Sequence, residues 1–223
     1  MSIDLSRFGA VLQDVSESDT ELRELPLDRV CGNPANFYPP IPAEELAELA
    51  DSIAANGLLE PLLVVDAGGV YKVISGHNRL RAVKALHEQS GGRDHGTVLC
   101  RVLPALDEAT ELTYIIEANR QRKKTPALLA LEAERLTEAY TRRKQAGEEL
   151  PGRIRPRVAE ALQVSETKLA NLTAIKNGLK NTQLRIWWEN GTMPESAALE
   201  AARMDVDEQD GLRTWMMNHY PAR

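Results

Sequence analysis

The spacing of apolar positions separates the chain into a mixed first part and a helical second part. After a proline-rich loop over residues 33–42, apolar residues fall on one helix face between residues 46 and 54, which predicts a helix ending at the next glycine. Two short apolar runs, 62–65 and 70–74, flank a Gly-Gly pair and predict a β-hairpin. A looser alternation over residues 22–30 predicts one more strand.

From residue 77 onward most segments have helical periodicity, with one predicted strand among them. Residues from about 77 to 88 predict a helix, residues 97–103 predict a strand, and Asp107 is a suitable N-cap for a further helix. A Thr-Pro pair opens the segment 125–146, which is a favourable start for the long helix that its periodicity predicts. Residues 147–156 contain glycine and proline and are expected to form a linker, and the remaining segments are helical in pattern.

These elements predict two domains of different class. Residues 21–118 combine strands and helices and predict an α+β domain, while residues 119–205 predict an all-α domain. Residues 1–20 are acidic and serine-rich without sustained periodicity, so they are expected to be a disordered tail. Residues 206–223 are expected to form a C-terminal helix or tail.

Composition excludes several classes of protein. The chain has 223 residues, 43% of them hydrophobic, which is enough for a buried core. Cys31 and Cys100 are far apart and have no partner at metal-binding spacing, which excludes a disulfide scaffold and a zinc knuckle. No apolar run approaches the roughly 18 residues that a membrane span requires. A cytoplasmic protein that does not enter the membrane is therefore expected.

The net charge of −6 by itself argues against a nucleic-acid partner, but the charge is unevenly distributed along the chain. Residues 1–60 carry a net charge of −9, whereas residues 119–180 carry +7. A basic block in an acidic chain indicates a polyanionic partner, although a solvated helix face has the same composition. The basic run at Arg120, Arg122, Lys123 and Lys124 falls between the two predicted domains, where it could contact DNA or simply be solvated.

A glycine joins a predicted strand to a predicted helix at residues 73–82. Gly76 allows close approach of a ligand to the backbone, and the free N–H groups of the helix start favour an anion. Arg79 and Arg81 add full positive charge in a turn where acidic residues are preferred, which predicts a phosphate site rather than a plain turn. Guanidinium groups locked in ion pairs with neighbouring carboxylates, with no vacant pocket ahead of them, would contradict it.

Residues 157–174 have the pattern of a helix-turn-helix. Val158 and Leu162 form the inner face of a first helix, and Ser165 caps a second one. Thr167, Lys168 and Asn171 then face outward near the start of the second helix, where such motifs read base edges, and three arginines precede the motif at positions suited to phosphates. The alternative is an ordinary helical hairpin within a bundle.

Three segments in this order resemble the ParB partition-protein family. They are Gly57–Val65, Ile74–Ala82 and the string Asn119–Arg122 followed by Pro126. The His-Asn pair in the glycine box is similar to the branch found on plasmids and other mobile elements. The resemblance implies a ParB/sulfiredoxin-like N-terminal domain that binds CTP, followed by a helix-turn-helix domain, with CTP and DNA together closing two protomers into a clamp.

The resemblance also assigns roles to particular residues. It implies nucleotide contacts for Gly57, Glu60, Pro61, Ser75, Gly76, His77, Asn78, Arg79, Arg81, Glu117 and Asn119, with Mg²⁺ held through the nucleotide near Glu117 and Asn119. Together with the charge pattern, it implies DNA contacts for Arg120, Arg122, Lys123, Lys124, Arg153, Arg155, Arg157, Ser165, Thr167, Lys168 and Asn171. The implied partners are double-stranded DNA with a specific site, a second copy of the chain and a ParA-type ATPase.

Two departures from the family pattern concern hydrolysis. The acidic residue that helps hold magnesium falls on Ala118, and the glutamine linked to hydrolysis falls on Pro39. Nucleotide binding with at most weak CTPase activity is therefore the expectation. The main expectation is a CTP-gated DNA clamp in plasmid or mobile-element partition, located with nucleoid or plasmid DNA. The alternatives are a helix-turn-helix transcriptional regulator with a degenerate nucleotide site and, less favoured, a ParB-like nuclease.

Overall fold

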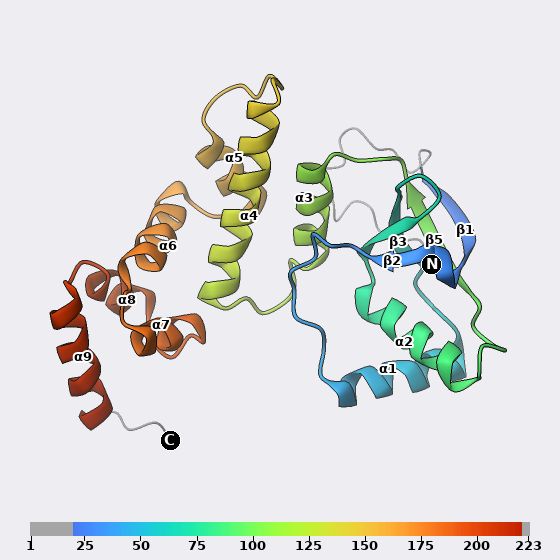
Figure 1. The fold of residues 1–223 in the computed structure, drawn as a ribbon, viewed down its shortest axis with the longest axis horizontal. Helices are drawn as coiled ribbons and strands as arrows, with labels where there is room; N and C mark the ends of the chain where they lie inside the picture. Colours follow the sequence, from blue (N-terminus) through green and yellow to red (C-terminus); the bar gives the residue numbers. More distant parts are fainter. Residues whose placement is uncertain (1–19, 220–223) are drawn as a thin grey trace. The chain divides into compact units, whose positions relative to one another are not determined.

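The computed structural model describes residues 20–219, which form two compact units (Figure 1). The first, called the N-terminal unit, extends to Arg120, and the second, called the C-terminal unit, begins at Gln121. The tail expected over residues 1–20 lies outside the described residues except for its last residue, and so do residues 220–223.

The N-terminal unit is built on a mixed five-stranded sheet in the order β1-β5-β3-β4-β2. Strands β3 and β4 form the expected antiparallel hairpin, and β5 pairs antiparallel with β1 but parallel with β3. The edge strand β2 pairs parallel with β4. The strands are β1 (Glu21–Pro26), β2 (Val30–Gly32), β3 (Leu62–Asp66), β4 (Tyr71–Ser75) and β5 (Thr97–Leu103).

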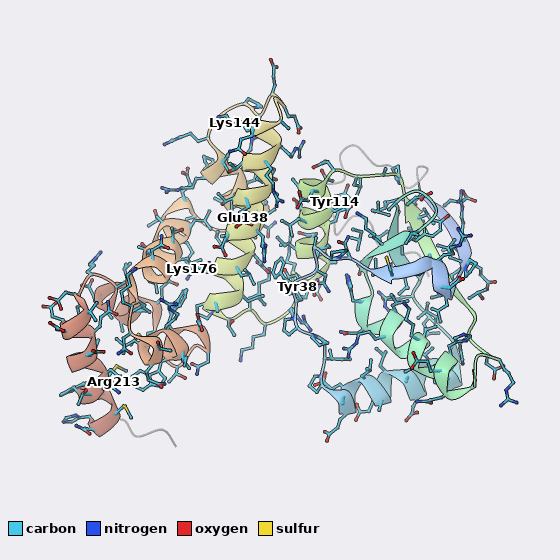
Figure 2. The ribbon with its side chains drawn as sticks, viewed as in Figure 1. Tyr38, Tyr114, Glu138, Lys144, Lys176 and Arg213 are labelled. Carbon is cyan, nitrogen blue, oxygen red and sulfur yellow. The ribbon has the colours of Figure 1, made fainter. Side chains whose placement is uncertain are left out.

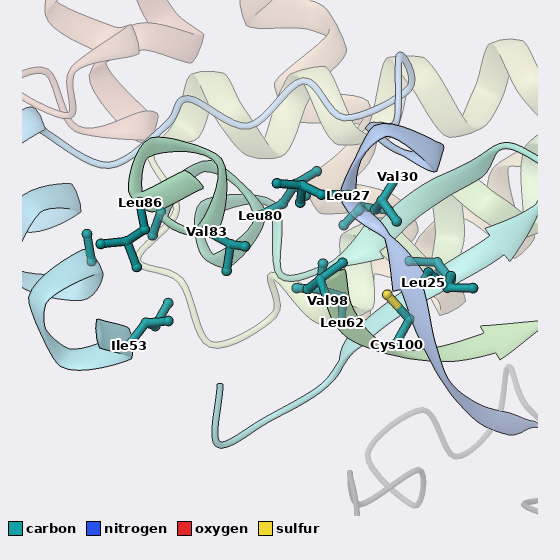
Figure 3. Packing of buried hydrophobic residues seen from close by; sticks show 14 of the residues in the cluster. Leu25, Leu27, Val30, Ile53, Leu62, Leu80, Val83, Leu86, Val98 and Cys100 are labelled. Carbon is teal, nitrogen blue, oxygen red and sulfur yellow. The ribbon is translucent and has the colours of Figure 1, made fainter. Parts of the chain in front are cut away.

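Helices α1 (Ala43–Asn56) and α2 (His77–Gln89) pack on each other, and α2 contacts β3. Figure 3 shows the hydrophobic core of this unit, a cluster that includes Ile53 of α1, Leu86 of α2, and Leu62 and Cys100 of the sheet. Helix α3 (Glu108–Ala118) contacts β4. The Asp107 side chain caps it as expected, accepting from the N–H groups of residues 109 and 110 at 3.0 and 3.1 Å. The predicted α+β class is confirmed.

The expected strand over residues 22–30 is wrong in its second half. The first strand ends at Pro26, which has no N–H to continue the ladder, and residues 27–29 form a 3-10 turn before β2 begins. Leu27 is buried within that turn. The alternation of apolar residues therefore came from two short strands and a turn, since a turn can also bury one of its side chains.

In the part that the structure describes, residues 121–219, the C-terminal unit contains helices and no strands, as predicted. Its helices are α4 (Pro126–Gln145), α5 (Ile154–Leu162), α6 (Glu166–Gly178), α7 (Thr182–Glu189), α8 (Glu195–Ala201) and α9 (Val206–His219). The Thr125 hydroxyl caps α4, accepting from the Leu128 N–H at 3.2 Å. Charged side chains such as Glu138 and Lys144 are exposed along α4 (Figure 2). The expected linker is shorter than predicted, because α5 already begins at Ile154.

Close packing between its helices holds the C-terminal unit together. Its core contains Trp188, which is 2% exposed, together with leucines of α6 and α7 and alanines of α8. A Cβ on Gly178 would lie 2.3 Å from the Ala202 carbonyl oxygen, so this glycine allows α6 to approach the end of α8. The fully buried Gln209 accepts from the N–H groups of Lys180 and Asn181 and so joins α9 to the turn before α7. Within residues 20–219, no helix has both the length and the apolar character that crossing a bilayer requires.

Candidate functional site

The junction between β4 and α2 has the geometry that the sequence predicts for an anion site. Gly76 adopts a left-handed conformation, with φ 99° and ψ 23°, and serves as the N-cap of α2 without a side-chain cap. The first intrahelical hydrogen bond runs from the Leu80 N–H to the Gly76 carbonyl at 2.9 Å, so the N–H groups of residues 77–79 precede it. The first turn holds no acidic side chain. These donors and the helix dipole together favour an anion.

Both the backbone angles and the closeness of neighbouring atoms require glycine at position 76. An added Cβ would lie 2.6 Å from Leu62 Cδ2 and 3.2 Å from the Arg79 Nε and Nη2 atoms. Leu62 is fully buried in the central strand β3, so it cannot move aside without disturbing the core. A side chain at position 76 would therefore meet both the core and the Arg79 guanidinium.

Arg79 connects the two segments that the resemblance assigned to the nucleotide. Its Nη1 donates to the carbonyls of Glu60 and Pro61, at 2.7 and 3.1 Å, and lies 3.2 Å from Glu60 Oε2. Burial lowers the pKa of Arg79, and the Glu60 carboxylate partly opposes that shift. The loop 57–61 and the Gly76 junction therefore lie side by side. However, the Arg79 guanidinium is already engaged, whereas Arg81 is exposed.

His77, the first residue of α2, is a neutral group in this site. Burial lowers its pKa from 6.5 to about 4. Its Nε2 atom accepts a hydrogen bond from the backbone N–H of Asn33 at 3.4 Å. An imidazole that accepts at Nε2 and stays neutral carries its proton on Nδ1.

We expect the N-terminal unit to lose stability as the pH falls through the range in which an unfolded histidine takes up a proton. The His77 pKa is about 4 when folded and 6.5 when unfolded, so its contribution is complete above the unfolded pKa and disappears as the pH drops toward 4. Between about pH 7.5 and about pH 5 the free energy of unfolding should fall by about 2 kcal/mol from this residue. Urea unfolding followed by NMR signals of β4 measures it, because all three tryptophans lie outside this unit.

The matched variant for this measurement is His77→Gln, whose side chain does not titrate but keeps an acceptor for the Asn33 N–H. We expect its free energy of unfolding to change less than that of the wild type over the same pH range. Equal changes in the two proteins would show that burial of His77 does not cause the loss.

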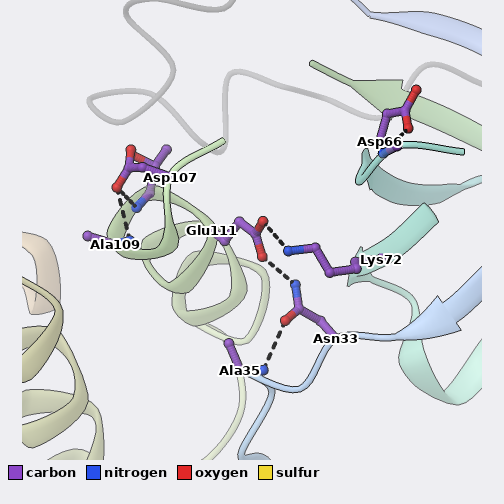
Figure 4. Close-up of polar contacts among 9 residues, drawn as sticks. Asn33, Ala35, Asp66, Lys72, Asp107, Ala109 and Glu111 are labelled. Atoms are coloured by element: carbon purple, nitrogen blue, oxygen red, sulfur yellow. Dashed lines mark hydrogen bonds and ion pairs between the residues drawn. The ribbon is translucent and has the colours of Figure 1, made fainter. Parts of the chain in front are cut away.

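A buried polar network next to His77 was missed by sequence reasoning (Figure 4). The Asn33 Nδ2 donates to Glu111 Oε2 at 2.9 Å, and Lys72 Nζ donates to Glu111 Oε1 at 2.5 Å. Asn33 and Glu111 are each only 5% exposed. One signal was available, since Glu111 precedes Ile115 by four residues and so falls on the apolar face of its helix.

Glu117 and Asn119 do not form a metal site in this structure. The Glu117 carboxylate is 7% exposed and pairs with Arg120, while Asn119 Nδ2 donates to the Ile115 carbonyl at 2.8 Å. No group of three or more His, Cys, Asp or Glu side chains within residues 20–219 is arranged to hold a metal ion. The donors present therefore fit Mg²⁺ only as an ion brought by a nucleotide, and this part of the expectation stays a prediction.

The basic run over residues 120–124, which spans the sequence boundary of the two units, is partly committed to ion pairs. Arg120 pairs with Glu117, and Lys124 lies 2.9 Å from the fully buried Glu132 of α4. Lys123 is exposed, and Arg122 is half-buried. The sequence could not show these partners, because burial of Glu132 depends on how α4 packs.

Helices α5 and α6 have the connection expected for a helix-turn-helix. Gln163 takes a left-handed conformation, with φ 54° and ψ 41°, and Ser165 caps α6 by accepting from the Lys168 N–H at 3.1 Å. The inner faces carry Val158, Ala159, Leu169 and Leu172, all buried. Both helices also pack on α4, and α6 packs on α8, so their inner faces are part of the core of the C-terminal unit.

The residues expected to read DNA differ in their surroundings. Thr167 is exposed and Asn171 is half-buried, while the Lys168 ammonium pairs with Glu195 at the start of α8. Arg153 and Arg155 are exposed before and at the start of α5. The partner of Lys168 was not predicted, and DNA contact by these residues stays a prediction.

Arg157 has a structural contact. Its Nη2 donates to the Pro151 carbonyl at 3.0 Å, and its Nε donates to the same oxygen at 3.3 Å. Arg157 therefore fixes the connection before α5, whereas Arg153 and Arg155 are the exposed cations of the group.

Comparison with known proteins agrees with this architecture. Residues 12–118 match the model of the ParB N-terminal domain. The probable plasmid-partitioning protein ParB of Thermus thermophilus is 31% identical over 211 residues, which cover 82% of this chain and 66% of that protein. The probable chromosome-partitioning protein ParB of Helicobacter pylori is 29% identical over 152 residues, which cover 68% of this chain and 50% of that protein. The chain thus spans from half to about two thirds of the length of these relatives.

Two solved structures share the fold. The C-terminally truncated chromosome-partitioning protein ParB from Caulobacter crescentus, complexed to the centromeric parS site, has a TM-score of 0.57 at 20% identity, over 90% of this chain and 94% of that one. A pNOB8-like ParB N-domain has a TM-score of 0.56 at 12% identity, over 82% of this chain and 74% of that one.

The mixed sheet, the glycine junction before α2 and the helical unit that follows define the class of two-part proteins with a ParB N-terminal fold. The chain belongs to the ParB family.

Proposed function

We propose that this chain is a sequence-specific DNA-binding protein of the partition type, whose N-terminal unit binds CTP and thereby controls its hold on DNA. The observation that carries this proposal is the uncapped start of α2 behind Gly76, joined by Arg79 to the loop 57–61. The identity of the nucleotide follows from the resemblance to the ParB family, which implies CTP at this box.

The nucleotide would occupy the space in front of the Gly76 junction. The N–H groups of residues 77–79 are suited to phosphate oxygens, and Arg81 supplies an exposed positive charge on the same helix. Mg²⁺ would enter with the phosphates and neutralise part of their charge. Hydrolysis is not proposed, because Ala118 and Pro39 stand where the family pattern has the residues linked to it.

DNA would be held by the helix-turn-helix of the C-terminal unit. The Caulobacter protein of the same fold was crystallised with its centromeric parS site, and we extend DNA binding to this chain on its own residues. Thr167, Lys168 and Asn171 would face the major groove from α6, while Arg153 and Arg155 would meet phosphates. Partition of a plasmid or mobile element would add a second copy of the chain and a ParA-type ATPase as partners.

Isothermal titration of the full chain with CTP and Mg²⁺ tests the nucleotide part, with ATP, GTP and UTP as the comparison. We expect CTP to bind with a Kd at least about tenfold lower than that of the other nucleotides, which corresponds to about 1.4 kcal/mol. The titration is repeated with a DNA site selected from random oligonucleotides. Absence of binding to every nucleotide, with and without DNA, would contradict the clamp.

The second candidate is a transcriptional regulator that binds DNA without nucleotide control. The engagement of Arg79 by Glu60 and Pro61 favours it, because the guanidinium already has partners. Retention on linear DNA separates the two candidates. A CTP-gated clamp stays longer on DNA with blocked ends than on DNA with open ends when CTP is present, whereas a plain regulator shows no such difference.

A further inference from the structure

We propose that Asn33 is a positioning residue, which holds the His77 imidazole at the start of α2 as a neutral hydrogen-bond donor through Nδ1 for a phosphate of the ligand. The identity of that ligand rests on the proposed function, whereas the position and tautomer of the imidazole do not. Asn33 lies directly after β2, outside the segments by which the chain resembles its family.

The first step is the tautomer of His77. The backbone N–H of Asn33 donates to Nε2 at 3.4 Å, so that nitrogen has a lone pair and no proton. The pKa of about 4, which burial causes, keeps the ring neutral at neutral pH. The remaining proton is then on Nδ1, and His77 offers a donor at the same helix end as the free N–H groups of residues 77–79.

The second step is what holds the Asn33 backbone in place. Its Oδ1 accepts from the Ala35 N–H at 2.9 Å, which closes a turn in the proline-rich loop. Its Nδ2 donates to Glu111 Oε2 at 2.9 Å, which ties the same residue to α3. The loop is thus fixed on one side by its own turn and on the other by a buried carboxylate.

The third step concerns Glu111, the residue that holds the Asn33 side chain in place. A buried carboxylate is unfavourable unless it is paired, and this one pairs with Lys72 of β4 while accepting from Asn33 (Figure 4). The strand that carries Lys72 ends at Ser75, immediately before the Gly76 junction. Glu111 therefore fixes Asn33 to the strand that leads into His77, and the distance between the Asn33 amide and the imidazole is set within one rigid network.

The variant that separates these contacts is Asn33→Asp. The aspartate keeps an acceptor for the Ala35 N–H, so the turn can form, but it places a second carboxylate against Glu111 in a buried site. The rescue variant is Asn33→Asp with Glu111→Gln, in which the new amide donates to the new carboxylate and Lys72 keeps an anionic neighbour. The matched control is Asn36→Asp, which adds the same charge in the same loop at a residue whose Oδ1 accepts from the Tyr38 N–H at 3.4 Å.

Two measurements are made on the full chain. Imidazole ¹⁵N–¹H correlation spectra without nucleotide report which nitrogen of His77 carries the proton, and titration with CTP and Mg²⁺ reports affinity. We expect the wild type to show a single tautomer protonated at Nδ1. In Asn33→Asp the two tautomers should mix and CTP affinity should fall about tenfold, as for one misplaced hydrogen bond. The rescue variant and the control should show the wild-type tautomer and affinity within about threefold.

Some results would overturn the proposal. A wild-type His77 protonated at Nε2 contradicts it whatever the variants do, and so does a folded Asn33→Asp that keeps both the tautomer and the affinity. If Asn33→Asp does not fold, the wild-type spectrum and the rescue variant still decide. Failure of every nucleotide to bind would overturn the proposed function, whereas an Nδ1-protonated tautomer that mixes in Asn33→Asp would still support Asn33 as the residue that positions His77.

Discussion

Gly76→Ala is expected to abolish nucleotide binding and to destabilise the N-terminal unit by about 3 kcal/mol. The backbone at this residue has a φ of 99°, which side chains rarely adopt, and the new Cβ would lie 2.6 Å from the fully buried Leu62. The same Cβ would press on the Arg79 guanidinium and so separate the loop 57–61 from the helix start. Titration with CTP and Mg²⁺ should show a loss of at least about 100-fold, or about 2.7 kcal/mol.

The matched control for this variant is Gly91→Ala, just beyond the other end of α2. Gly91 also has a positive φ, 66°, but an added Cβ there would meet no atom within 4 Å. We expect a cost of about 1 kcal/mol from the backbone alone and CTP affinity close to that of the wild type. Equal losses in the two variants would show that the effect comes from the positive φ and not from the junction.

The double variant Lys168→Ala with Asn171→Ala is expected to remove sequence-specific DNA binding while leaving the C-terminal unit folded. Both residues lie near the start of α6, where bidentate contacts to bases are worth about 1–3 kcal/mol each, so specific affinity should fall about 10²- to 10³-fold. Binding to unrelated DNA should fall much less, because only one positive charge is lost. A fluorescence titration of the selected site against a scrambled one, at fixed salt, measures both.

Lys176→Ala is the matched control on the same helix. Lys176 lies near the end of α6 and pairs with Glu134 of α4 at 2.5 Å, away from the turn between α5 and α6 (Figure 2). We expect its specific affinity to stay within about threefold of the wild type. Undiminished binding by the double variant, with the control unchanged, would show that another surface reads the DNA.

The pair between Lys168 and Glu195 sharpens this expectation. In the free protein the ammonium is held by a carboxylate from the start of α8, so contact with DNA requires Lys168 to exchange that partner for a base or a phosphate. Loss of the Lys168–Glu195 ion pair therefore offsets part of the free energy that Lys168 gains from contact with DNA. The loss in Lys168→Ala alone should accordingly be smaller than the loss in Asn171→Ala alone.

Local signals in the sequence were sufficient for most of the secondary structure. The hairpin of β3 and β4 followed from two apolar runs around Gly68 and Gly69, and Asp66 completes that turn by accepting from both glycine N–H groups. The helix caps at Asp107 and Thr125 followed from residue types that compete for free N–H groups. Such features depend on neighbours within a few residues, and so they can be read from the chain directly.

Contacts between distant segments could not be read in the same way. Arg79 was expected to be available for a phosphate, yet its guanidinium donates to carbonyls 18 and 19 positions earlier in the chain. Lys124 was expected to be at the surface, yet it compensates the buried Glu132. In both cases a charged group pairs with a residue that only tertiary packing brings near. Such pairing is needed because a buried charge without a partner is unfavourable.

What the sequence by itself determined is the order of the elements, the class of each domain and the glycine junction before α2, since periodicity, caps and a positive φ are properties of short segments. Only the tertiary structure decided which side chains meet at that junction. The network of Asn33, Lys72 and Glu111 joins residues up to 78 positions apart, and a contact of that kind exists only after β2, β4 and α3 have packed together. Burial also lowers the pKa of His77 and so keeps its imidazole neutral, where the sequence alone shows only a histidine.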